Sequence, residues 1–276
     1  MNMKNIKFGK IDLSLRGFGA KRPENLPNTT KALDIIENIV FQKLKEQGFR
    51  KHGRTLHRFV SGDISQVINF QSGKPADGMA GIFCVNIGIR VPECDEKQFY
   101  PTEPMKKYYK EYECNIRTRL GHIVSGKDVW YDTKKPEKTG NMILSQLLEK
   151  VIPVFDILCS REAILKYRRD YSSFDTLNSR LILLEEAMIY GHLGDIEKAK
   201  DLYQQYHDNC VKKYENDKKQ GRKVWMDKGN RIVFKDQDGN TQDITASKNG
   251  YITIFDADHS HIDYIEELGK RLGLFT

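Results

Sequence analysis

Two carboxylates and two imidazoles lie within six residues near the end of the sequence. The four side chains are Asp256, Asp258, His259 and His261. Oxygen and imidazole ligands of this kind can hold a divalent metal ion, which would suit a metal-dependent hydrolase centred on residues 256–263. The competing interpretation is structural, because aspartates favour helix starts and residues two apart on a helix diverge by about 200°. Both interpretations stay open at this point.

A tyrosine- and lysine-rich segment is the second group of residues whose types could carry a function. Its candidate binding residues are Tyr100, Lys106, Lys107, Tyr108, Tyr109 and Tyr112. Aromatic rings interleaved with lysines can stack on nucleic-acid bases. Tyrosines also form hot spots in protein interfaces, because they supply a large contact area at low entropic cost. The simplest structural interpretation is an amphipathic helix whose tyrosines cover a sheet.

Neither a complete catalytic motif nor a cofactor motif occurs in the sequence. His52 and His57 flank a short polar turn, but a catalytic histidine needs a nucleophile and an orienting group within reach. Residues 236–243 are rich in aspartate yet lack the terminal glutamate of a calcium loop, so we expect a hairpin turn there. The sequence therefore favours a protein that is not an enzyme, without a cofactor.

The elements that would position these groups begin with a helix, a hairpin and a strand. Apolar residues at helical spacing predict a helix over residues 30–47, which ends at Gly48 with a left-handed backbone. Apolar and polar residues then alternate over 55–60 and 64–71, which predicts a hairpin. The same alternation over 82–91 predicts a half-buried strand.

Weaker patterns predict the rest of the fold. Between residues 116 and 159 we expect a strand over 116–123, an edge strand at Trp130 and Tyr131, a linker over 136–140, and a helix over 141–159 interrupted at Pro153. Further on we expect a helical hairpin over 178–220, a β-hairpin from 231–235 and 241–245, a strand over 251–255 and a closing helix over 260–272.

These elements together predict an α+β fold, in which an antiparallel sheet is flanked by helices. A C-terminal helical hairpin and a closing β-hairpin, strand and helix follow it. We expect an N-terminal arm over 1–27, an α+β domain over 28–165, and a C-terminal region over 166–276 that is either separate or one unit with that domain.

Several residues of the predicted core resemble a known family. They are the helix end and turn at 44–53, Leu56 to Arg58, the Asn-Phe-Gln-Ser strand at 67–72, the strand at 83–88, Arg119 to Gly121, and Trp130. Over roughly residues 30–165 the sequence resembles domain-of-unknown-function family 4304, with a helical and β extension beyond it. The resemblance implies an α+β sheet flanked by helices. Because the family has no established activity, it implies no catalytic residues.

Charge and cysteine content limit the class of protein and its surroundings. The net charge of +7 comes from 45 lysines and arginines spread among 38 acidic residues, without a block of one sign. The five cysteines form no closely spaced pair, which predicts free thiols in a reducing cytosol. No apolar run approaches the roughly 20 residues of a membrane span, so we expect a cytoplasmic protein without membrane contact.

We expect the chain to act as a non-catalytic protein-interaction module in the bacterial cytoplasm, with another protein as its partner. An immunity-type or accessory protein is one form of this hypothesis. The alternatives are a nucleic-acid-binding protein that uses the basic Tyr/Lys surface, and the metal-dependent hydrolase described above. The sequence does not indicate an oligomeric state.

Overall fold

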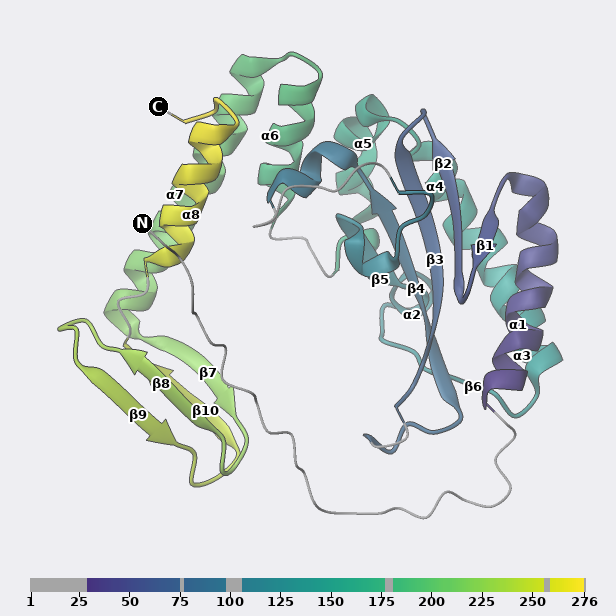
Figure 1. Ribbon diagram of the computed structural model, residues 1–276, viewed down its shortest axis with the longest axis horizontal. Coiled ribbons are helices and arrows are strands. Elements are labelled where there is room, and N and C mark those ends of the chain that lie inside the picture. The colour runs from purple at the N-terminus through teal and green to yellow at the C-terminus, as the bar shows by residue number, and fades with distance from the viewer. Residues whose placement is uncertain (1–28, 75–76, 98–105, 177–180, 256–258, 276) are drawn as a thin grey trace.

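A computed structural model describes residues 29–74, 77–97, 106–176, 181–255 and 259–275, and its centre is an antiparallel sheet (Figure 1). The strand order is β1–β2–β3–β4–β5, and the short β6 pairs with the first residues of β4. The strands are β1 Arg50–His52, β2 Thr55–Val60, β3 Ile64–Ser72, β4 Ile82–Arg90, β5 Ile116–Arg119 and β6 Tyr131–Asp132. The predicted α+β class with an antiparallel sheet is confirmed.

Helices cover one face of this sheet and close the main core. The helices are α1 Thr29–Leu44, α3 Pro136–Gln146, a π-helical turn Leu147–Val151, and α4 Ile152–Ile157. Strand pairing places Leu56, Ile68 and Ile87 in one row across β2, β3 and β4, and all three are fully buried. Between α1 and α3, a Cβ on Gly140 would lie 3.3 Å from the Cα of Ile36, so this glycine permits close helix packing.

The first part of the predicted core is confirmed in detail. Helix α1 passes into a 3-10 turn, Lys45–Gln47, and Gly48 follows with a left-handed φ of 86°. The β2–β3 hairpin and strand β4 lie where alternation predicted them. The pattern missed β1, because three polar, exposed residues give no apolar signal.

Three predictions between residues 92 and 159 are wrong. Residues 120–125 form helix α2, Leu120–Ser125, in place of the end of a strand. The predicted linker over 136–140 is the start of α3, because proline is tolerated at the first helical position. The tyrosine-rich segment has short 3-10 turns at Pro92–Lys97 and Glu111–Glu113 and no amphipathic helix among its described residues.

Outside residues 222–254, most of the described C-terminal half is helical. The helical segments are α5 Arg161–Tyr167, a 3-10 segment Arg168–Phe174, α6 Ile182–His192, α7 Ile196–Gln220 and α8 Ser260–Arg271. Helices α6 and α7 form the predicted helical hairpin, and α8 returns along α7 (Figure 1). At the start of α7, the side chain of Asp195 accepts a hydrogen bond from the amide of Lys198. This N-cap fixes where α7 begins after the turn that follows α6.

A buried ion cluster joins the 3-10 segment to α6. Both the Nε and Nη2 of Arg168 donate to the carboxylate of Asp175, at 2.8 and 2.7 Å, and Nη2 also donates to Glu185 at 2.6 Å. All three side chains are 1% exposed or less. The guanidinium of Arg168 therefore lies between two buried carboxylates and neutralises charge on both.

Between α7 and α8 the chain forms one long β-hairpin that is interrupted at its middle. Strand β7 (Arg222–Met226) pairs with β10 (Gly250–Ile254), and β8 (Arg231–Lys235) pairs with β9 (Thr241–Thr245). Met226 is opposite Gly250, and five residues further on each side Arg231 is opposite Thr245, so the register is the same in both ladders.

The long hairpin doubles back on itself at this interruption (Figure 1). At its tip Gln237 donates a hydrogen bond to the carbonyl of Lys218, near the end of α7. Burial alternates along β7, β8 and β10, whereas only Ile244 is partly buried in β9. The apolar side chains on the inner side are Val224, Met226, Ile252, Ile254, Ile232, Phe234 and Ile244. The other side of β7 and β10 is exposed.

Candidate interaction surface

The Tyr/Lys segment is a strap, residues Lys106–Asn115, that crosses the sheet face opposite the helices. The ring of Tyr109 is buried 3.8 Å from the guanidinium of Arg90, and the ring of Tyr108 stacks on His52 at 3.6 Å. Only Tyr112 among its described tyrosines points outward, with 62% of its surface exposed. Tyr108 and Tyr109, which the sequence suggested as base-stacking residues, therefore cover the sheet.

The lysines of the strap are exposed but serve local contacts. Lys106 forms an ion pair with Glu113 at 2.9 Å, and the ammonium of Lys110 lies 5.5 Å from the Tyr112 ring. Lys107 is exposed, and Tyr100 lies outside the described residues. The six predicted binding residues do not form one array in the part of the strap that the structure describes.

His57 lies under the strap, and its environment opposes protonation. Burial, then the positive charge of Arg50 and the nearby His52, lower the pKa of His57, against a smaller opposing hydrogen bond to the backbone of Lys107. Because the unfolded chain then binds a proton more readily than the folded one, stability must fall as the pH falls below the ordinary histidine pKa of about 6.5.

We expect a His57→Gln variant to remove this part of the pH dependence. The wild-type melting temperature should fall more between pH 7.5 and pH 5 than that of the variant, because only the wild type carries the buried imidazole. Thermal unfolding followed by circular dichroism over this range measures both slopes. Parallel slopes for the two proteins would contradict the assignment.

The predicted metal ligands have separate partners where the structure describes them. The Nδ1 of His259 lies 2.8 Å from Asp263, and its ring meets the edge of Tyr214. The Nε2 of His261 lies 3.9 Å from the Sγ of Cys210, at a hollow of about 260 Å³ between α7 and α8. Asp256 and Asp258 lie outside the described residues, so the metal site stays a prediction.

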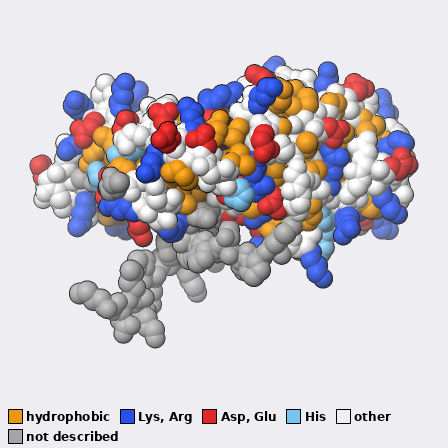
Figure 2. Space-filling view, turned by 90° about the horizontal axis from the view of Figure 1, so that it is seen from above, with side chains coloured by type: hydrophobic (Ala, Val, Ile, Leu, Met, Phe, Trp, Pro, Cys, Tyr) orange, Lys and Arg blue, Asp and Glu red, His pale blue; other side chains and the backbone are white. Residues whose placement is uncertain are grey.

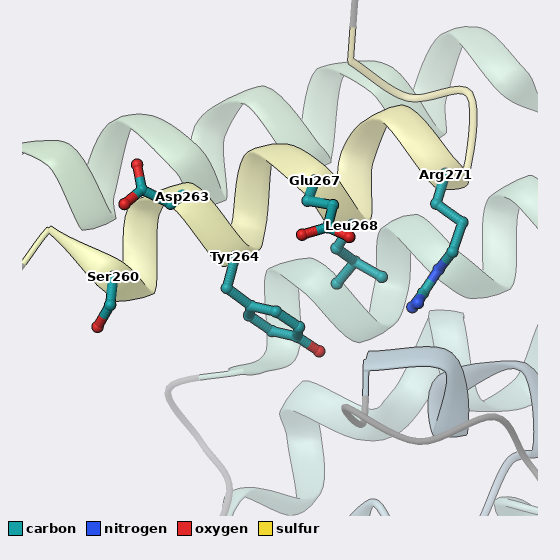
Figure 3. Close-up of a pocket in the computed structure, with 6 residues that line it drawn as sticks. All are labelled: Ser260, Asp263, Tyr264, Glu267, Leu268 and Arg271. Atoms are coloured by element: carbon teal, nitrogen blue, oxygen red, sulfur yellow. The ribbon is translucent and has the colours of Figure 1, made fainter. Parts of the chain in front are cut away.

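A second hollow, of about 290 Å³, runs along α8 (Figure 3). Its lining residues all come from this one helix, and Asp263 points away from Tyr264 and Arg271. Within the described ranges, no three histidine, cysteine, aspartate or glutamate side chains form a group that could hold a metal ion. The hollow along α8 therefore draws on one element, whereas the hollow between α7 and α8 places His261 beside Cys210.

A group of exposed aromatic residues lies on the outer side of β7 and β10 and directly after β10. Trp225 and Tyr251 are opposite each other in the register, with ring centroids 5.1 Å apart and an interplanar angle of 76°. They are 53% and 71% exposed, and Phe255, directly after β10, is 46% exposed. Lys223 and Thr253 form the row between them. We call these five residues the outer hairpin face.

Gly221 explains how Phe255 extends this face. Its φ is 78°, and a Cβ there would overlap the methyl group of Thr253 and lie 3.0 Å from the Phe255 ring. A glycine at the junction of α7 and β7 therefore lets the Phe255 ring lie close to the backbone. The face therefore consists of two rows of the β7–β10 ladder and, as a third row, Phe255 directly beyond its end.

Exposed cations lie at both ends of the outer hairpin face. Lys218 and Lys219 end α7 beside Gly221, and Lys228 and Lys248 lie in the interruption beyond Trp225. Several nearby acids have local partners: Asp227 accepts a hydrogen bond from the Trp225 indole, and the carboxylate of Asp236 accepts bonds within the hairpin turn. These four lysines have no ion-pair partner among the residues that the structure covers.

The sequence prediction missed this surface, although part of the signal was present. Alternation predicted strands at 231–235, 241–245 and 251–255, but the pairing of 222–226 with 250–254 joins segments separated by 23 residues. Strand β7 has apolar residues on both sides, Val224 and Met226 on one and Trp225 on the other, so periodicity alone does not show which side faces water. The exposure of Trp225 follows from the way the long hairpin doubles back and encloses the other side of β7.

Comparison with known families gives one match, over the sheet and its helices. Residues 40–157 match the model of a family described as Domain of unknown function (DUF4304), which confirms the resemblance seen in the sequence for this region. The outer hairpin face lies beyond the matched residues. Comparison with curated proteins and with solved structures gave no match. No described helix is long and apolar enough to cross a membrane.

Proposed function

We propose that this protein, with its DUF4304 match at residues 40–157, is a non-catalytic interaction module that binds another protein through the outer hairpin face. The observation that carries the proposal is the exposed cross-strand pair Trp225 and Tyr251. Tryptophan and tyrosine are the residues most enriched among interface hot spots, and they gain most when a partner removes them from water.

The charge distribution also supports a local binding surface over a general affinity for nucleic acid. On the face in Figure 2, lysines and arginines are interspersed with aspartates and glutamates over the whole length. Within the strap, Tyr108 and Tyr109 contact the sheet and leave their rings little room for bases. A broad basic groove with free aromatic platforms would favour nucleic acid.

An immunity-type or accessory protein of the bacterial cytoplasm is the finer form of this proposal. All five cysteines are free thiols, and three of them are buried, which suits a reducing compartment. Burial raises the pKa of Cys84 to about 11, so this thiol is protonated at neutral pH and unsuited to nucleophilic chemistry.

Replacing both Trp225 and Tyr251 with alanine should abolish partner binding without unfolding the chain. Each truncation is expected to cost about 2 kcal/mol or more, roughly 30-fold in Kd, because hot-spot aromatics dominate interface energies. Affinity capture from source cells identifies a stoichiometric partner, and titration calorimetry with that purified partner measures the loss.

Tyr112→Ala is the matched control, because Tyr112 is an equally exposed tyrosine on the strap. It should bind the partner like the wild type. Loss of binding in this control with retention in the Trp225/Tyr251 variant would move the interface to the strap and refute the proposal.

A further inference from the structure

We propose that the outer hairpin face binds an extended, acidic polypeptide segment whose apolar side chains alternate with aspartate or glutamate. This inference rests on the proposed function and names the class of its partner. The relevant geometry is two rows of side chains in the β7–β10 ladder, the aromatic pair and then Lys223 with Thr253, followed by Phe255 directly beyond the ladder.

The spacing of the rows matches an extended chain. Tyr251, Thr253 and Phe255 are two residues apart, and the first two project from the same side of β10. Side chains on one side of an extended polypeptide repeat at about 6.8 Å, twice the rise of one strand residue. Apolar side chains at alternate positions of a partner segment can therefore contact successive rows, while the intervening side chains point elsewhere.

The area of the face suits a segment better than a globular partner. The exposed fractions of Trp225, Tyr251 and Phe255 correspond to roughly 400 Å² of aromatic surface, since a whole aromatic side chain covers about 150–250 Å². A stable interface between two globular surfaces, including a second copy of this chain, needs about 800 Å² from each partner. A short segment needs less.

The charges around the face select an acidic partner. Lys223 lies within it, Lys218 and Lys219 lie at the end near Gly221, and Lys228 and Lys248 lie at the other end. Between residues 210 and 255 the sequence has ten lysines and arginines and six acidic residues. Carboxylates at both ends of a bound segment would meet these ammonium groups.

The same observations disfavour single-stranded nucleic acid as the occupant. A nucleic-acid strand carries one phosphate per base and needs a line of cations that follows it beside flat aromatic platforms. Here Lys223 is the cation within the three described rows, and the rings of Trp225 and Tyr251 meet edge to face. The other four lysines lie at the ends of the face, where carboxylates in the terminal parts of a short acidic segment would lie.

Fluorescence of Trp225 tests the inference directly. The chain has two tryptophans, so a Trp130→Phe background leaves Trp225 as the reporter. The probes are blocked eight-residue peptides, (Glu-Phe)₄, (Ser-Phe)₄ and (Lys-Phe)₄, together with the oligonucleotide (dT)₈. We expect (Glu-Phe)₄ to bind at least tenfold more tightly than the other three, with an affinity that falls as salt rises.

Two charge variants test whether the peptide binds at the outer hairpin face. Lys223→Glu should weaken (Glu-Phe)₄ binding at least tenfold. Lys235→Glu should change it by less than twofold, because Lys235 is an exposed lysine on β8, in the other ladder. Circular dichroism confirms that both variants remain folded.

Each remaining outcome has a definite meaning. Equal binding of (Ser-Phe)₄ and (Glu-Phe)₄ overturns the acidic class, and tighter binding of (dT)₈ overturns the polypeptide class. Absence of a Trp225 response to every probe also overturns the inference. The proposed function fails separately, when the Trp225 and Tyr251 double variant retains its cellular partner.

Discussion

Arg168→Ala should destabilise the folded protein by about 3–5 kcal/mol, the range for removing one partner of a buried ion pair. The guanidinium makes three hydrogen bonds, two to Asp175 and one to Glu185, and none of the three side chains reaches water. Its removal would leave two carboxylates in a medium that disfavours their charge. Urea unfolding followed by circular dichroism measures the loss.

Arg169→Ala provides the matched control for this cluster. Arg169 is the next residue in the chain and also binds a glutamate, Glu186, at 2.8 Å. Its side chain is 58% exposed, so water and salt already screen the pair, and we expect a loss of at most about 1 kcal/mol. Similar losses in the two variants would show that burial of the Arg168 cluster has no special energetic role.

Replacing all three side chains of the Arg168 cluster with neutral ones separates the effect of their buried charge from the effect of the volume they fill. Replacing Arg168, Asp175 and Glu185 together with methionine, asparagine and glutamine should recover much of the stability lost in Arg168→Ala, because none of these three positions then carries a buried charge. If the triple variant is no more stable than the single one, packing volume rather than uncompensated charge determines the effect.

Gly88→Ala should release the strap from the sheet. A Cβ at position 88 would lie 2.6 Å from the Sγ and 2.8 Å from the Cβ of Cys114, closer than nonbonded atoms come. Position 88 lies inside β4, which is paired on both sides, so the strap must move and not the strand. We expect a loss of about 1–3 kcal/mol, typical of overpacking.

Hydrogen exchange locates the effect of this substitution. Amide protection should fall in residues 106–115 and remain in β3 and β4, because only the strap is displaced. The compensating variant Gly88→Ala with Cys114→Gly removes both clashing atoms and should restore protection in the strap. If protection is lost in β4 and the second substitution restores nothing, the clash is relieved by distortion of the sheet.

Much of the sheet could be predicted from sequence because its signals are local. The helix end at Gly48, the β2–β3 hairpin and the alternation in β4 each have a cause within a few residues. The same kind of local signal gave a wrong prediction where tertiary contacts determine the secondary structure. Proline and glycine at 136 and 140 resemble a linker, yet Gly140 is there because Ile36 and Ile39 of α1 approach it closely.

The candidate surface could not be predicted from sequence for a related reason. The Tyr/Lys segment has the composition of a binding surface, but Tyr109 packs against Arg90, a residue of strand β4. Trp225 and Tyr251 have no local feature that marks them as partners. Their exposure depends on long-range pairing and on the contact of Gln237 with Lys218.

The unchanged register across the interrupted hairpin constrains how its length can vary. Residues 227–230 and 246–249 are equal in number, so the two sides of the interruption match. A deletion of one residue on one side alone would shift β10 by one position against β7 and turn Tyr251 inward. Insertions and deletions that preserve the aromatic pair must therefore occur in compensating pairs, one on each side of the interruption.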